Sequence, residues 1–193
     1  FAVGGAGQFT SADIEALTAL GSDTGGFLSG SFICLDTTSG DFTCSANIGN
    51  PNGGAIVLGL SKFDPYYPAP TTLTLTGDNT YTGQTIIYKG AISVSSINSV
   101  VTDPVLGTVH SASSNLGAPT TVANGTIVIG ANQYGATGRL IYTGTGETTD
   151  RVIAFSTESD SAVILDQSGP WGLLKFTSDL FVGTMTGKTV TFQ

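Results

Sequence analysis

Residues 73–94 read LTLTGDNTYTGQTIIYKGAISV, and this stretch decides the fold class. Apolar and polar residues alternate in three short runs, which is the period-2 pattern of strands that bury one face. Turn-forming residues at 77–79, 82–84 and 89–90 separate the runs. The alternation predicts that the inward side chains are Leu73, Leu75, Ile86, Tyr88, Ile92 and Val94, with Ile87 on the outer side. Such a unit cannot bury its apolar face alone, so we expect similar layers stacked above and below it.

The same stretch closely resembles the autotransporter-associated β-strand repeat. That family has a leucine-threonine strand, a G-x-N-T-Y-T-G-x-T turn and a strand that ends in G-x-[LI]-x-V. The matching residues here are Leu73, Thr74, Leu75, Thr76, Gly77, Asn79, Thr80, Tyr81, Thr82, Gly83, Thr85, Gly90 and Val94. Residues 59–62 and 115–117 resemble the family's flanking segments more loosely. The resemblance implies a right-handed parallel β-helix in a very large secreted or surface-attached protein, and it implies no enzyme and no catalytic residues.

Composition limits the classes of protein that the chain can belong to. Its 193 residues suffice for one sizeable domain, and charged residues make up only 10% of them. The formal net charge is −8, and the six Lys and Arg residues do not cluster. We therefore expect neither a nucleic-acid partner nor binding to an anionic membrane through a basic patch. No run approaches the ~20 apolar residues of a membrane span, so we expect this segment not to be membrane-embedded.

The N-terminal sequence FAVGGAGQFT has neither the basic region nor the apolar region of a signal peptide. We interpret the chain as a processed or excised piece of a longer protein, with its export and anchoring parts elsewhere. Residues 10–21 then predict one short amphipathic helix. Thr10 or Ser11 is its N-cap, Ile14, Leu17 and Leu20 share one face, and Gly21 follows the last turn. We expect this helix to be a cap or an insertion of the solenoid.

The two cysteines, Cys34 and Cys44, lie in predicted strands on either side of a turn at 37–41. Three interpretations compete. A disulfide between them suits an exported protein, two buried thiols are an alternative, and a metal site is a poor third because His110 is the only histidine. We favour the disulfide. We expect no metal, no cofactor and no catalytic residues.

Residues 63–70 read FDPYYPAP and depart from the family pattern by forming a longer, proline-rich loop. Phe63, Tyr66 and Tyr67 make it the candidate recognition loop, because aromatic side chains can stack on a sugar or pack against a protein partner. An insertion folded against the solenoid wall is the interpretation that we favour. We expect a surface glycan or a ligand on a host or neighbouring cell only as the alternative.

Beyond residue 94 the pattern becomes weaker and then regular again. Residues 99–102 and 105–109 predict two weak strands. Glu147, Asp150 and Arg151 in TGTGETTDRV predict a salt-linked turn. Further strands are predicted at a spacing of about a dozen residues, with centres near Val128, Ile141, Ile153, Ile164, Lys175 and Val190.

These patterns lead to one fold class and one function class. We predict a single all-β domain over residues 1–193, a right-handed parallel β-helix (β-solenoid) with one short N-terminal helix; an antiparallel β-sandwich is the alternative. The predicted function is a structural segment of a large secreted or cell-surface protein: a stalk, an adhesin shaft or an extracellular fibre. Its expected partners are itself or adjacent segments, and it can assemble end to end. A carbohydrate-binding or carbohydrate-active β-helix is the alternative function.

Overall fold

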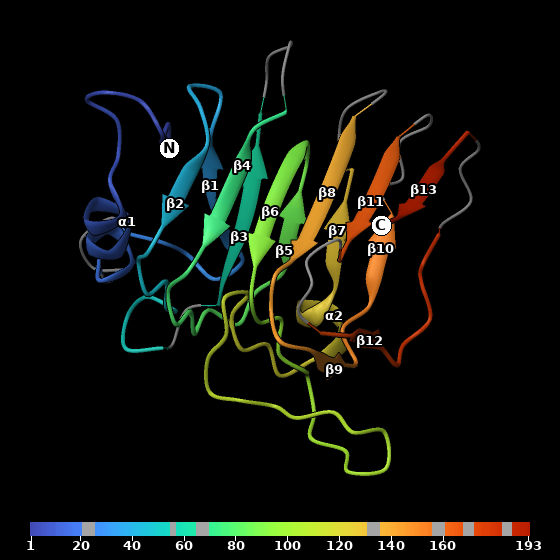
Figure 1. Cartoon of the computed structure of the whole chain (residues 1–193). Coiled ribbons are helices and arrows are strands. Elements are labelled where there is room, and N and C mark those ends of the chain that lie inside the picture. Colours follow the sequence, from blue (N-terminus) through green and yellow to red (C-terminus); the bar gives the residue numbers. More distant parts are fainter. Residues whose placement is uncertain are drawn as a thin grey trace.

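Parallel strands wind around a common axis and form a right-handed β-solenoid (Figure 1). The computed structural model describes residues 1–20, 26–54, 57–64, 70–130, 136–155, 161–167, 172–182 and 187–193. All pairs between its named strands are parallel within these residues, which confirms the predicted fold class over the antiparallel sandwich.

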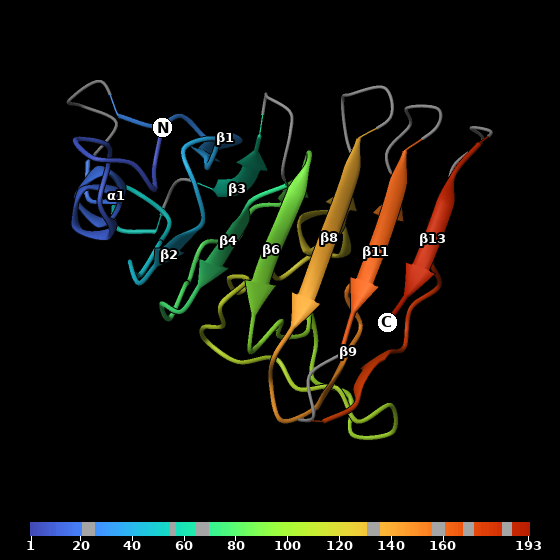
Figure 2. The same ribbon diagram turned by 45° about the horizontal axis from the view of Figure 1, so that its top comes forward.

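Two large sheets form the walls of the solenoid, and a small sheet forms part of a third side. The five-stranded sheet contains β1 (Ser31–Asp36), β3 (Leu58–Phe63), β5 (Thr85–Ile87), β7 (Ile127–Ile129) and β10 (Ile153–Phe155) in that order. The six-stranded sheet contains β2 (Phe42–Cys44), β4 (Thr72–Leu75), β6 (Gly90–Val94), β8 (Thr137–Tyr142), β11 (Ala162–Asp166) and β13 (Thr189–Phe192), side by side in Figure 2. β9 (Glu147–Thr149) and β12 (Leu174–Phe176) form the two-stranded sheet.

Strands of the two walls alternate along the chain, so each turn of the solenoid passes from one wall to the other. In Figure 1 the five-stranded sheet lies behind with its strands running upward, and the six-stranded sheet lies in front with its strands running downward. Adjacent turns stack at the spacing of hydrogen-bonded strands, about 4.8 Å. The core lies between the walls, where Leu35, Leu60, Ile87 and Ile129 face Leu73, Ile92 and Leu140.

The stretch 73–94 forms β4, β5 and β6, as predicted. In one of these strands, however, the side chains face the opposite sides from those predicted. Leu73, Leu75, Ile92 and Val94 are buried in the core as expected. In β5, however, Thr85 and Ile87 are buried while Ile86 is half-buried, so the prediction of an inward Ile86 and an outward Ile87 was wrong. The hydroxyl of buried Tyr81 lies 2.9 Å from Thr85 Oγ1, which holds Thr85 on the inner side.

The turn residues of this stretch join neighbouring turns of the solenoid. Asn79 accepts a hydrogen bond from the Ile48 amide at 2.8 Å and donates one to the Asn115 carbonyl at 2.7 Å. Burial raises the pKa of Tyr81 to about 12. Gly77 and Gly83 lie directly on the backbone of the preceding turn, where a β-carbon would stand 1.9 Å from the Ala46 oxygen and 2.4 Å from the Leu58 oxygen. A side chain at either position would therefore separate the turns.

Several predicted elements are shifted or replaced. The strand predicted over residues 54–60 is β3, Leu58–Phe63. All six strands predicted after residue 122 are present, but β9 was missed, and residues 99–102 and 105–109 are loops. The predicted salt-linked turn is also wrong, because Arg151 is buried in the core and donates to the carbonyls of Gly125, Ile97 and Leu116. Burial lowers the pKa of this guanidinium to about 10.

Candidate functional site: the open end of the solenoid

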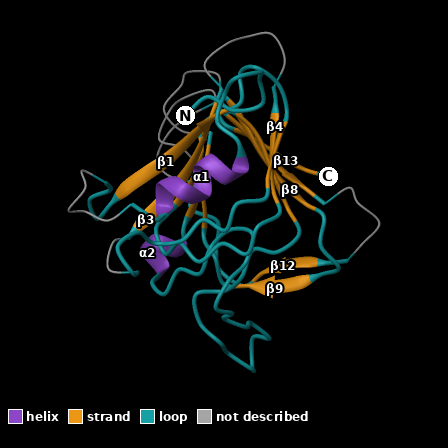
Figure 3. Ribbon diagram, turned by 90° about the vertical axis from the view of Figure 1, so that its left-hand side faces the viewer, coloured by secondary structure: helices purple, strands orange, loops and turns teal. Residues whose placement is uncertain are grey.

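The two ends of the solenoid differ, and the N-terminal end is closed. Helix α1 (Ser11–Thr18) lies across this end between the two walls (Figure 3). Thr10 caps it by accepting from the Asp13 amide, while Asp13 Oδ2 accepts from the Thr10 amide at 2.8 Å. Ile14 is 0% exposed and Leu17 packs against the core, but Leu20, also predicted for this face, is exposed because the helix ends at Thr18.

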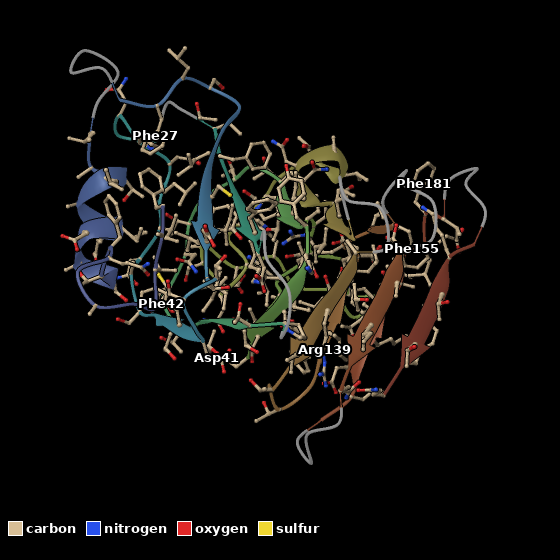
Figure 4. All side chains as sticks on the ribbon, turned by 90° about the horizontal axis from the view of Figure 1, so that it is seen from above. Phe27, Asp41, Phe42, Arg139, Phe155 and Phe181 are labelled. Carbon is tan, nitrogen blue, oxygen red and sulfur yellow. The ribbon has the colours of Figure 1, made fainter. Side chains whose placement is uncertain are left out.

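The strand edges at this end are covered as well. Residues 1–3 run beside the end of β1, where the Val3 amide donates to the Asp36 carbonyl at 2.9 Å and the Asp36 amide donates to the Phe1 carbonyl at 2.8 Å. Ser11 Oγ accepts from the Ser45 amide, just after β2, at 3.0 Å. Phe27 lies at the same end and packs against the core (Figure 4). Residues 1–20 therefore close the first turn of the solenoid.

Within the described residues, the C-terminal end is open. Side chains that would belong to the core of the last turn are only half-buried here: Leu165, Leu174, Phe176, Leu180 and Val190. Phe192 is 68% exposed and Leu173 is 73% exposed. A recess of about 210 Å³ lies at this end, lined mainly by Leu140, Leu165, Leu174, Phe176 and Phe192. This apolar face is of the kind that marks an interaction site.

In the part of the chain that the structure describes, no strand lies beside the outer edge of β13. The amides of Thr189 and Gln193 donate to the Ser161 and Leu165 carbonyls next to and within β11, at 3.3 and 3.0 Å. Because backbone groups alternate in direction along a strand, those of Val190 and Phe192 point to the other side. No described segment pairs with that side of β13. β10 differs, because Phe181 already lies beside it and exchanges backbone hydrogen bonds with Ile153 and Phe155 (Figure 4).

Polar groups form the rim of this open end. Arg139 pairs with Asp166 on the outer side of the six-stranded sheet and also donates to Gln193 Oε1 at 3.2 Å. Arg151 lies in the core instead, so the two arginines do not share a groove with clustered acids. The open end thus combines an apolar centre, a polar rim and a free strand edge, a set of features suited to the addition of a further β-strand.

The predicted site residues lie elsewhere. Cys34 points outward from β1, between the inward Ile33 and Leu35, whereas Cys44 points into the core from β2 in the other wall. Both are free cysteines, so the disulfide that we favoured is not formed. Burial raises the pKa of the Cys44 thiol.

In the candidate recognition loop, Phe63 is the last residue of β3 and packs edge-on against Tyr88, with ring centroids 5.9 Å apart. Tyr66 and Tyr67 lie outside the described residues. Among the described residues, no group of three or more His, Cys, Asp or Glu side chains is placed to hold a metal ion. No described helix is long and apolar enough to cross a membrane.

Comparison of the chain with protein-family models, with curated proteins and with solved structures found no match. The resemblance of residues 73–94 to the autotransporter repeat therefore stays a prediction. End-to-end assembly was expected from the sequence, but the residues exposed at the open end were not, since the exposure of Phe192 and Leu173 depends on which turn of the solenoid they occupy.

Proposed function

We propose that this chain is a structural segment of a large secreted or cell-surface protein, in which it forms the closed start of a solenoid shaft. One observation carries the proposal: residues 1–20 close one end, whereas the apolar face and the β13 edge are open at the other. A further turn placed on the open end would extend the six-stranded sheet and cover Phe192. The few charges and the resemblance of residues 73–94 support a place outside the cell.

The occupant of the open end is a segment of the same kind, either adjacent in the large protein or in a second copy. We expect that a second copy does not stack head to tail while α1 covers the core of the first turn, and while residues 1–3 and Ser11 occupy backbone groups at the edges of β1 and β2. Two isolated chains can meet only through their open ends, and that contact is closed by a two-fold axis. We therefore expect association of the isolated chain to stop at pairs.

Replacing Phe192 by Asp tests this proposal. A carboxylate in the centre of the open face must be desolvated when a partner covers it, so the variant should associate at least about tenfold more weakly than the wild type, or about 1.4 kcal/mol. Sedimentation velocity across a concentration series measures this directly. The matched control is Val105→Asp, which changes an apolar residue that is 92% exposed, on a loop distant from the open end in sequence.

A wild-type chain that stays monomeric throughout the series would contradict the docking role of the open end. If Phe192→Asp and Val105→Asp weaken association equally, the docking role of the open end is contradicted as well. The contact between chains would then not be specific to the open end.

A further inference from the structure

The outer side of the five-stranded sheet carries a second surface, which is separate from the open end. Strand register places Phe32 of β1 beside Gly59 of β3. Leu60 pairs with Thr85, so Gln84 follows Gly59 in the same row, and the Leu60 amide donates to the Gln84 carbonyl at 3.0 Å. Their neighbours Ile33, Leu60 and Thr85 point inward and are buried, so this row of three lies on the outer side.

An aromatic ring lies close to the glycine of this row. Phe32 is 38% exposed, and a β-carbon on Gly59 would stand 2.4 Å from its ring atom Cε1. Gly59 therefore leaves the space that the ring occupies, and Gly30 and Gly83 line the same groove without side chains. A partly exposed aromatic ring thus lies beside three glycines that carry no side chains.

Two side-chain amides line the same groove, on later turns of the solenoid than Phe32. Gln84 comes from the row itself, and Asn124 comes from the short helix α2 (Val122–Gly125), whose start is held by Thr121 Oγ1 accepting from the Asn124 amide at 3.3 Å. Neither side-chain amide has a hydrogen-bond partner in the part of the chain that the structure describes. No charged residue lines the groove, which has a volume of about 330 Å³.

We propose that this groove, lined by Phe32, Gly59, Gln84 and Asn124, binds a neutral saccharide. A sugar ring presents C–H groups that pack on an aromatic face, and its hydroxyls need donors and acceptors of the kind that a side-chain amide supplies together. A groove of this size with an apolar floor and a few polar groups is typical of small-molecule sites. The absence of charge among its lining residues favours a neutral saccharide over a uronate or a sulfated glycan.

The direction of the groove indicates a linear ligand. Its residues come from four successive turns of the solenoid, so it runs along the axis for about three strand spacings, or ~14 Å. A linear oligosaccharide could lie along it, with one sugar on Phe32 and others beside Gln84 and Asn124. With this site, the shaft would bind glycans on its side, independently of what docks at its open end.

Saturation-transfer difference NMR with a panel of neutral linear oligosaccharides (glucan, mannan, galactan and N-acetylglucosamine oligomers) tests the proposal. At least one of them should give a signal that an anionic oligogalacturonate does not give. Phe32→Ala should weaken binding about tenfold or more, because it removes the stacking face. Phe181→Ala, which removes another exposed phenylalanine at the C-terminal end, should leave binding unchanged.

If circular dichroism shows that Phe32→Ala does not fold, Asn124→Ala provides a second variant, at a partly exposed position. It should weaken binding severalfold, because it removes one donor and one acceptor. The proposal is overturned if no neutral oligosaccharide binds the wild type, or if folded variants at Phe32 and Asn124 bind as the wild type does. Phe192→Asp changes the open end and not the groove. This variant should therefore retain saccharide binding whether or not the open end docks a partner.

Discussion

Replacement of Ile14 by Asp should convert limited pairing into open-ended filaments. Ile14 is 0% exposed beneath α1, and burial of an ionised carboxylate there would cost several kcal/mol, so α1 should leave its place. The first turn would then expose its core side chains Ile33 and Cys44 and the edge of β2 that Ser11 covers. This surface complements the open C-terminal end, and a head-to-tail contact that does not close makes a fibre. Negative-stain electron microscopy across a concentration series detects such filaments.

The control for this experiment lies on the same helix. Ala16→Asp adds the same charge to an exposed position of α1 and should behave as the wild type does. Circular dichroism shows whether the Ile14 variant keeps its β-structure. If it does not, Leu17→Ser is a less disruptive substitution that also weakens the packing of α1 on the core. Folded Ile14→Asp protein that associates no further than pairs would show that α1 is not what limits assembly.

Gly77→Ala should be among the most destabilising single substitutions in the chain. The new β-carbon would stand 1.9 Å from the Ala46 oxygen and 2.6 Å from the Ala46 carbonyl carbon. These are backbone atoms of the neighbouring turn, and they cannot rotate away as a side chain can. We expect a loss of about 3 kcal/mol or more in the free energy of unfolding and a fall in Tm on the order of 10 °C. Denaturant titration and thermal melting measure both.

Gly49→Ala is the matched control, because its β-carbon would meet only the Thr80 hydroxyl, at 3.1 Å, and its backbone is not in the left-handed region. This variant should lose no more than about 1 kcal/mol. If Gly77→Ala and Gly49→Ala are equally stable, the close stacking of turns at Gly77 does not contribute to stability as we infer.

The stretch 73–94 allowed the fold class to be predicted from the sequence. The alternation of Leu73, Leu75, Ile92 and Val94 identified the inward faces of β4 and β6 correctly. It failed in β5, where the run TIIY offers apolar residues on both sides and alternation alone cannot choose between them. The choice depends on contacts outside the strand, namely the Tyr81–Thr85 hydrogen bond and the close approach of Gly83 to Leu58.

Contacts between distant segments explain most of the other differences. Arg151 stands in a polar, turn-like sequence, but its carbonyl partners come from residues 26 to 54 positions earlier in the chain. The saccharide groove is similar, since Phe32, Gly59 and Gln84 meet only through strand register. Neither arrangement produces a pattern that can be recognised in the local sequence. The N-cap of α1, by contrast, is local, and Thr10 was one of the two residues predicted for it.

Native-state hydrogen exchange tests the central claim, that the solenoid is closed at its start and open at its end. Amides of the first turn, in β1 and β2, should be protected nearly as well as those of β4 and β6, because residues 1–20 cover them. Val190 and Phe192 should exchange fast at low protein concentration, since their amides face the free edge, and should become protected as the concentration rises. Equal fraying at both ends, or protection of Val190 and Phe192 that is independent of concentration, would contradict the account.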